Sequence, residues 1–173
     1  MEVTKSSRHR AIIGHFGEHL ICNWLSRSGF EVAIVDHTGI DVVAFNPSNG
    51  ERLGISVKSR TRNAGSQNTS VNLLTKEKDR EKIVDACNAF ACLPWIAIYV
   101  ETVTYADIFL LSLSHYERTY LGPRAQKVYA WAMGADRVKR YLEDPEVMHI
   151  RVDFNASNWW ATKQLQDLES DED

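Results

Sequence analysis

Residues 53–60 constrain the fold most, because apolar and polar side chains alternate along them. The two sets interleave one residue at a time: Leu53, Ile55 and Val57 against Ser56, Lys58 and Arg60. Successive side chains of a β-strand point to opposite faces of its sheet. The segment therefore predicts a strand with one face in a hydrophobic core and a lysine and an arginine on the other.

Residues 7–28 predict an amphipathic helix ahead of this strand. Their apolar side chains recur at intervals of three and four residues, as on the buried face of a helix: Ile12, Ile13, Phe16, Leu20, Ile21, Trp24 and Leu25. Gly29 follows and suits a helix end, since glycine tolerates the left-handed backbone found there.

The remaining pattern predicts an α/β fold with a mixed sheet. Three short β-type runs separated by turn signals predict a meander at 30–35, 41–45 and 52–59. The polar, aperiodic stretch 61–72 predicts a loop. We expect further elements downstream: a helix at 75–91, strands at 95–101 and 107–113, a helix at 137–143 and an edge strand at 147–154.

The composition of the 173-residue chain predicts one domain, residues 1–166, with an acidic tail at 167–173. The net charge is −3, but five acids lie in the last seven residues, so residues 1–166 carry +2. No apolar run approaches the ~20 residues of a membrane helix, and the N-terminus is polar. We expect a cytoplasmic protein without a membrane partner.

The basic residues cluster between positions 58 and 82, where the formal charge is +4. Such a patch favours a surface that faces phosphate groups. Four residues are candidates for nucleic-acid binding: Arg60, Arg62, Lys76 and Lys78. The alternative is a solvated start of a helix, held by ion pairs one turn apart.

Three short sequences in this order resemble the PD-(D/E)XK nuclease superfamily: residues 14–18, Gly-His-Phe-Gly-Glu; residues 39–41, Gly-Ile-Asp; and residues 56–60, Ser-Val-Lys-Ser-Arg. The resemblance covers residues 10–113 and is nearest to the restriction-endonuclease-like and archaeal Holliday-junction-resolvase branch. It implies a restriction-endonuclease-like core, a metal-dependent endonuclease acting on DNA and, by analogy, a homodimer.

The resemblance also implies a catalytic set formed by Glu18, Asp41, Ser56 and Lys58. Hydrolysis of a phosphodiester needs charge neutralisation and a hydroxide near neutral pH, and a divalent metal supplies both. The implied ligands of Mg²⁺, or alternatively Mn²⁺, are Asp41, Glu18 directly or through water, and the backbone carbonyl of Val57. Lys58 would position the attacking water and stabilise the developing negative charge.

Ser56 departs from the family pattern, which has Glu, Asp or Gln two residues before the lysine. The nearest spare acid on that strand, Glu51, is about 16 Å away along an extended chain, too far to replace it. Two outcomes stay open: a nuclease with a reduced metal site, or a catalytically inactive fold that binds nucleic acid or protein. Glu18 and Lys58 have a plainer alternative as solvated residues, and an unrelated small α/β domain is a third interpretation.

Overall fold

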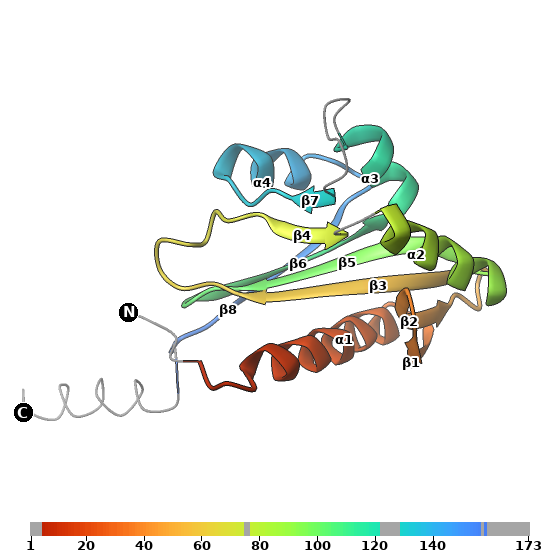
Figure 1. Cartoon of the computed structure of the whole chain (residues 1–173), viewed down its shortest axis with the longest axis horizontal. Helices are drawn as coiled ribbons and strands as arrows, with labels where there is room; N and C mark the ends of the chain where they lie inside the picture. The colour runs from red at the N-terminus through yellow and green to blue at the C-terminus, as the bar shows by residue number, and fades with distance from the viewer. Residues whose placement is uncertain (1–4, 75–76, 122–128, 157, 159–173) are drawn as a thin grey trace, which may run out of the picture.

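The computed structural model describes residues 5–74, 77–121, 129–156 and 158 of the chain. They form a mixed α/β fold of eight strands and four helices (Figure 1). In chain order these are α1 His9–Arg27, β1 Glu31–His37, β2 Ile40–Phe45, β3 Arg52–Thr61, β4 Val71–Leu74, α2 Glu77–Ala89, β5 Leu93–Glu101, β6 Tyr105–Ser112, α3 Leu113–Thr119, β7 Tyr129–Trp131, α4 Ala135–Leu142 and β8 Met148–Asp153.

Six strands form the main sheet in the order β1-β2-β3-β5-β6-β8. The predicted meander is confirmed, since β1, β2 and β3 pair as antiparallel neighbours. β3 and β5 are parallel, because α2 carries the chain back over the sheet between them, and β6 and β8 complete the sheet as antiparallel strands. β4 and β7 form a separate antiparallel pair.

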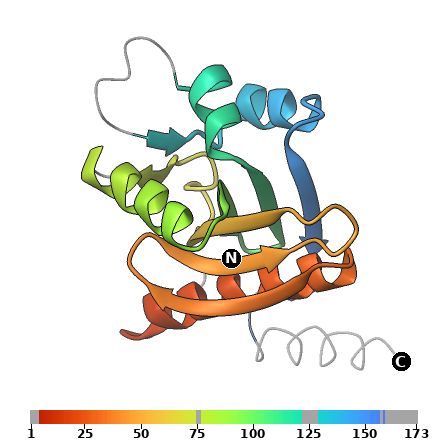
Figure 2. The same ribbon diagram turned by 90° about the vertical axis from the view of Figure 1, so that its right-hand side faces the viewer.

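The main sheet lies between two layers. Both views show α1 along one face and α2, the β4–β7 pair, α3 and α4 on the opposite side (Figures 1 and 2). The apolar residues of β3 pack in the core beneath α1, as their alternation predicts: Leu53, Ile55 and Val57. A second core fills the space on the other side of the sheet. No helix among the described residues is long and apolar enough to cross a bilayer.

The buried face of α1 differs from the predicted one. Ile12 and Phe16 were expected to be buried, but they are 58% and 48% exposed. The buried row consists of residues at intervals of four: Ile13, Gly17, Ile21 and Leu25. A Cβ at Gly17 would lie 2.0 Å from Ser59 Oγ, so the helix can approach β3 only because residue 17 has no side chain. Apolar periodicity alone cannot detect a glycine at the point of contact.

Two alanine substitutions in α1 are expected to have opposite effects on stability. Gly14→Ala places a methyl group where no atom lies within 4 Å, and should raise the free energy of unfolding by about 0.5–1 kcal/mol through helix propensity. Gly17→Ala should lower it by about 1–3 kcal/mol, because the methyl group overpacks the contact with Ser59. Urea unfolding of both variants tests this, and equal shifts would contradict the close contact.

The two-stranded sheet was not predicted, whereas α3 lies where helical segments without set bounds are expected, after the strand at 107–113. β4 lies at the end of the segment expected to be a loop, and it pairs with β7 more than fifty residues later. Strands of four and three residues are too short to show a period, and their pairing is non-local. β5 also begins at Leu93 and includes Pro94, which was expected to precede the strand.

A buried ion cluster joins the last two strands of the sheet. Asp107 of β6 is 1% exposed and accepts hydrogen bonds from Arg151 Nε and Nη2 and from His149 Nε2, each 2.8 Å long. Burial opposes ionisation of Asp107, but the bonds from β8 outweigh it and lower its pKa. The carboxylate therefore stabilises the fold above the usual carboxyl pKa, and this stabilisation is lost as the pH falls through the lowered folded-state value.

Arg151→Met is expected to lower the free energy of unfolding by about 1–3 kcal/mol near neutral pH, because it leaves a buried carboxylate with one partner fewer, although Arg151 itself is 44% exposed. Lys139→Met is the matched control. Lys139 lies 3.9 Å from Glu143 in an exposed pair, and its loss should cost under about 1 kcal/mol. Chemical denaturation measures both, and an Arg151 variant as stable as the control would show that the cluster contributes little.

Candidate active site

A polar cleft of about 440 Å³ lies where β2 and β3 face β4 and α2. It collects residues from five elements and from the turn between β1 and β2. Its lining residues are Arg10, Thr38, Gly39, Asp41, Ser56, Lys58, Arg60, Asn72, Leu73, Leu74, Asp79, Lys82 and Ile83. Four cations and two carboxylates thus share the cleft, which has a net positive charge.

Asp41 is fixed at the start of β2 by the neighbouring strand. Its Oδ2 accepts a hydrogen bond of 2.6 Å from the backbone N–H of Val57. Gly39, two residues earlier, has a φ of +110°, and a Cβ there would lie 2.4 Å from the Lys82 carbonyl oxygen. Glycine is therefore required for the turn and for the approach of α2. The second carboxylate oxygen of Asp41 remains available to the cleft.

Lys58 extends from the cleft-facing side of β3. Its Nζ donates to Ser56 Oγ at 2.9 Å and to the Val57 carbonyl oxygen at 3.2 Å. Burial lowers the pKa of the Lys58 ammonium, and the charge of Asp41 acts in the opposite direction. The ammonium thus lies beside the Val57 carbonyl, which the family resemblance implies as a metal ligand.

Ser56 is 3% exposed at the base of the cleft. Its hydroxyl accepts the bond from Lys58, and in the sheet it lies opposite Ile96 of β5. A short neutral side chain therefore occupies the position where the family pattern has an acid or amide. β3 itself contributes no carboxylate to the cleft.

Glu18 does not line this cleft. It projects from α1, where its Oε2 lies 3.6 Å from His15 Nδ1. The negative charge of Glu18 raises the pKa of Lys58, but this effect is the smallest among the groups that act on the lysine. The structure therefore brings Asp41, Ser56 and Lys58 together, with the Val57 carbonyl, and leaves Glu18 outside.

The predicted basic residues lie in different environments. Arg60 lines the cleft, whereas the Arg62 guanidinium donates to the carbonyls of Thr69 at 3.3 Å and Ser70 at 2.9 Å and so holds the chain before β4. Lys78 is exposed at the start of α2. Lys76 lies outside the described residues.

Arg10 of α1 is a cleft residue that sequence reasoning missed. Burial, and then the charge of Arg10, lower the pKa of Arg60, so two guanidinium groups are held near each other. Among the described residues, no carboxylate forms an ion pair with either, whereas Arg80, Arg118 and Arg151 are all paired. Two such cations beside a cleft suit an anionic ligand.

Asp79 of α2 was also missed, whereas its neighbour Lys82 belongs to the basic cluster expected between positions 58 and 82. Their Oδ1 and Nζ atoms lie 3.1 Å apart. A signal for them exists in the sequence, because the buried row of α2 includes Ile83 and Cys87, and Asp79 lies one turn before Ile83 on the same face. The sequence alone could not show that this face meets β2 and β3.

The donor atoms in the cleft suit a hard divalent cation. Asp41 supplies a carboxylate oxygen and Ser56 a hydroxyl, and the Val57 carbonyl oxygen lies beside them, 3.2 Å from Lys58 Nζ. Mg²⁺ prefers oxygen ligands and retains several waters beside one or two carboxylates. Within the described part of the chain, no group of three His, Cys, Asp or Glu side chains is arranged to hold a metal. Mg²⁺ thus fits the site by ligand type, with few protein ligands.

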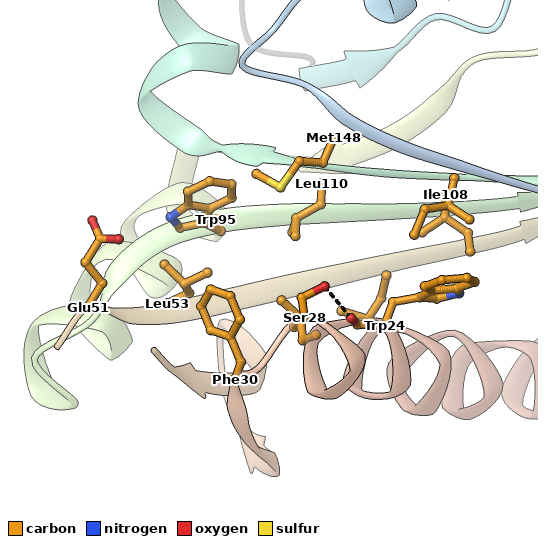
Figure 3. Close-up of a pocket in the computed structure, with 12 residues that line it drawn as sticks. Trp24, Ser28, Phe30, Glu51, Leu53, Trp95, Ile108, Leu110 and Met148 are labelled. Atoms are coloured by element: carbon orange, nitrogen blue, oxygen red, sulfur yellow. Dashed lines mark hydrogen bonds between the residues drawn. The ribbon is translucent and has the colours of Figure 1, made fainter. Parts of the chain in front are cut away.

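A second hollow, of about 330 Å³, lies between α1 and the sheet (Figure 3). Its walls are mainly apolar, with Trp24, Phe30, Trp95 and Met148 among them. The hydroxyl of Ser28 donates a hydrogen bond to the Trp24 carbonyl oxygen, 2.8 Å away. The other polar residue of this hollow is Glu51, whose Oε2 accepts a hydrogen bond of 2.7 Å from Asn49 Nδ2, so the polar cleft is the better candidate for chemistry.

The comparisons with known proteins show the fold. No protein-family model matches the sequence, and no curated protein matches it. The chain is similar to the 1.6 Å structure of Hjc, a Holliday junction resolvase from the archaeal hyperthermophile Archaeoglobus fulgidus. The TM-score is 0.50 and the identity 18%, over 69% of this chain and 83% of the resolvase. The fold expected from the sequence is confirmed: a mixed α/β fold of the restriction-endonuclease-like kind.

Proposed function

We propose that this protein is a Mg²⁺-dependent endonuclease that hydrolyses DNA phosphodiester bonds, of restriction-like or resolvase-like type. One observation carries the proposal: Asp41 and Lys58 converge in a cleft with a net positive charge. The family resemblance of the sequence and the similarity in fold to a Holliday junction resolvase support it.

Each residue of the centre has a defined task in this proposal. Asp41 and the Val57 carbonyl would hold a divalent cation, which would supply charge neutralisation at the phosphate and a hydroxide near neutral pH. Lys58 keeps its ammonium beside that carbonyl, where it can donate a hydrogen bond to a phosphate oxygen and stabilise developing negative charge. Ser56 orients the ammonium by accepting from it. Glu18 lies outside the cleft beside His15, and it would reach the cation only through water.

Arg60 and Arg10 would hold backbone phosphates next to the reacting one. Their guanidinium groups lie at the cleft and can form paired hydrogen bonds with phosphate oxygens. Lys78 would add long-range attraction from the exposed start of α2. Binding should therefore weaken with added salt and depend little on base sequence.

Two copies of the chain would act together on duplex DNA, because two strands must be cut and each copy would supply one reactive centre. Sedimentation velocity with and without a four-way junction tests this. A species of twice the chain mass supports a homodimer, and a monomer bound to a cleaved junction would exclude it.

The test of function is cleavage of end-labelled DNA. The panel contains linear duplex, single-stranded, flapped and four-way-junction DNA, with Mg²⁺, Mn²⁺ or EDTA. The proposal expects products from at least one substrate with metal and none with EDTA. No product from any substrate, with DNA binding intact, would contradict it.

An inactive binding module of the same fold is the second candidate, and Ser56 favours it because a ligand charge is absent from β3. Ser56→Glu separates the two candidates. Wild-type protein that is silent but gains Mg²⁺-dependent cutting on this substitution identifies a binding module with a decayed centre. Cutting by the wild type excludes this second candidate.

A further inference from the structure

The cleft contains a second carboxylate that does not come from β3. Asp41 is the acid predicted from the sequence, and Asp79 of α2 lines the same cleft. A cation site with one carboxylate beside several lysines and arginines would bind Mg²⁺ weakly, because the neighbouring positive charges repel the ion. The origin of a second negative charge therefore decides how well the centre can hold metal.

The position of Asp79 follows from the contact between α2 and the turn before β2. A Cβ at Gly39 would lie 2.4 Å from the Lys82 carbonyl oxygen and 2.9 Å from the Ile83 nitrogen, so this turn of α2 rests directly on Gly39. Residues three and four apart lie on the same face of a helix. Asp79 precedes both by one turn, and it lines the cleft together with Gly39.

The charges of the cleft agree with this placement. The Asp79 side chain is 30% exposed, and its Oδ1 lies 3.1 Å from Lys82 Nζ. Asp79 also shares the cleft with Asp41 and Lys58, whereas Glu18 of α1 does not line it.

We propose that Asp79 is a ligand of the divalent cation bound by Asp41, and that it supplies the negative charge which Ser56 does not. Lys82 balances Asp79 in the absence of metal and turns to solvent or phosphate when the cation binds. The proposal rests on the proposed function for the identity of the cleft, but metal binding can be measured without any DNA.

The experiment is Mn²⁺ binding to the full chain, measured from the electron paramagnetic resonance signal of free Mn²⁺. The variants are Asp79→Asn and Asp41→Asn, with Asp85→Asn as the matched control, since Asp85 is exposed on the same helix. Circular dichroism checks that each variant is folded. Asp79→Asn and Asp41→Asn should each weaken binding about 10–100-fold, and Asp85→Asn should bind like the wild type.

A rescue variant makes the test stronger. Adding Ser56→Glu to Asp79→Asn restores a carboxylate on β3 and should recover most of the lost Mn²⁺ affinity. Wild-type affinity in Asp79→Asn alone overturns the inference, as does a wild type that binds no Mn²⁺. If Asp79→Asn weakens binding but the wild type cuts no DNA, the inference stands and the proposed nuclease function fails.

Discussion

Asp41→Asn is expected to reduce DNA cleavage by at least roughly 10²-fold, the loss seen when an electrostatic contact of a reactive centre is removed. The asparagine side chain keeps an oxygen that can accept a hydrogen bond from the Val57 N–H. Asp41 Oδ2 accepts this bond at 2.6 Å in the wild type. The junction between β2 and β3 should therefore persist. The variant lacks only the negative charge and the second carboxylate oxygen needed for a cation.

Cleavage rates and DNA affinity, measured on the best substrate of the panel, test this prediction. DNA affinity should be retained or should increase, since a negative charge leaves a positive cleft. Asp36→Asn is the control, because Asp36 is an exposed carboxylate on the adjacent strand β1. Equal cleavage by the two variants would remove Asp41 from the reactive centre.

Lys58→Met is expected to lower cleavage by roughly 10²–10³-fold and, at the same time, to raise the free energy of unfolding near neutral pH. The ammonium is the donor placed to stabilise charge on phosphate, and methionine cannot replace it. Burial lowers the pKa of Lys58, so the folded protein holds this charge at a cost that an apolar side chain of similar length avoids.

The pH dependence of stability gives this prediction a second measurement. Because the pKa of Lys58 is lower in the folded state, the unfolded chain binds more protons between that value and the usual lysine pKa. Lys58 should therefore contribute a rise in the free energy of unfolding with pH through this alkaline window, measured as the difference between the wild type and Lys58→Met. Lys58→Met should lose that rise, and Lys139→Met, at an exposed site, should keep it. A Lys58 variant that is less stable but fully active would contradict both expectations.

The sequence predicts those parts of the centre that depend on one strand. The faces of β3 follow from a period of two, which places Ser56, Lys58 and Arg60 together whatever packs above them. The local pattern also indicates Asp41, because a charged residue without a partner is unfavourable in an apolar strand.

The rest of the centre depends on packing that no local pattern contains. Asp79 and Arg10 reach the cleft because helices dock at particular points, and those points are set by Gly39 and Gly17, residues with no side chain to signal a contact. Glu18 shows the same limit in reverse. The position of Glu18 in the sequence matches the family pattern, but the way α1 packs on β3 leaves its side chain outside the cleft.

A single-turnover cleavage assay tests most directly whether Asp41 and Lys58 form one Mg²⁺-dependent reactive centre. It compares wild-type protein, each single variant and the double variant Asp41→Asn/Lys58→Met on the same DNA, with Mg²⁺ and with EDTA. Residues that act as a unit have non-additive effects, so the double variant should be no slower than the slower single variant, and only the wild type with Mg²⁺ should cut efficiently. Cleavage by the double variant at the wild-type rate, or wild-type cleavage that persists in EDTA, would contradict this centre.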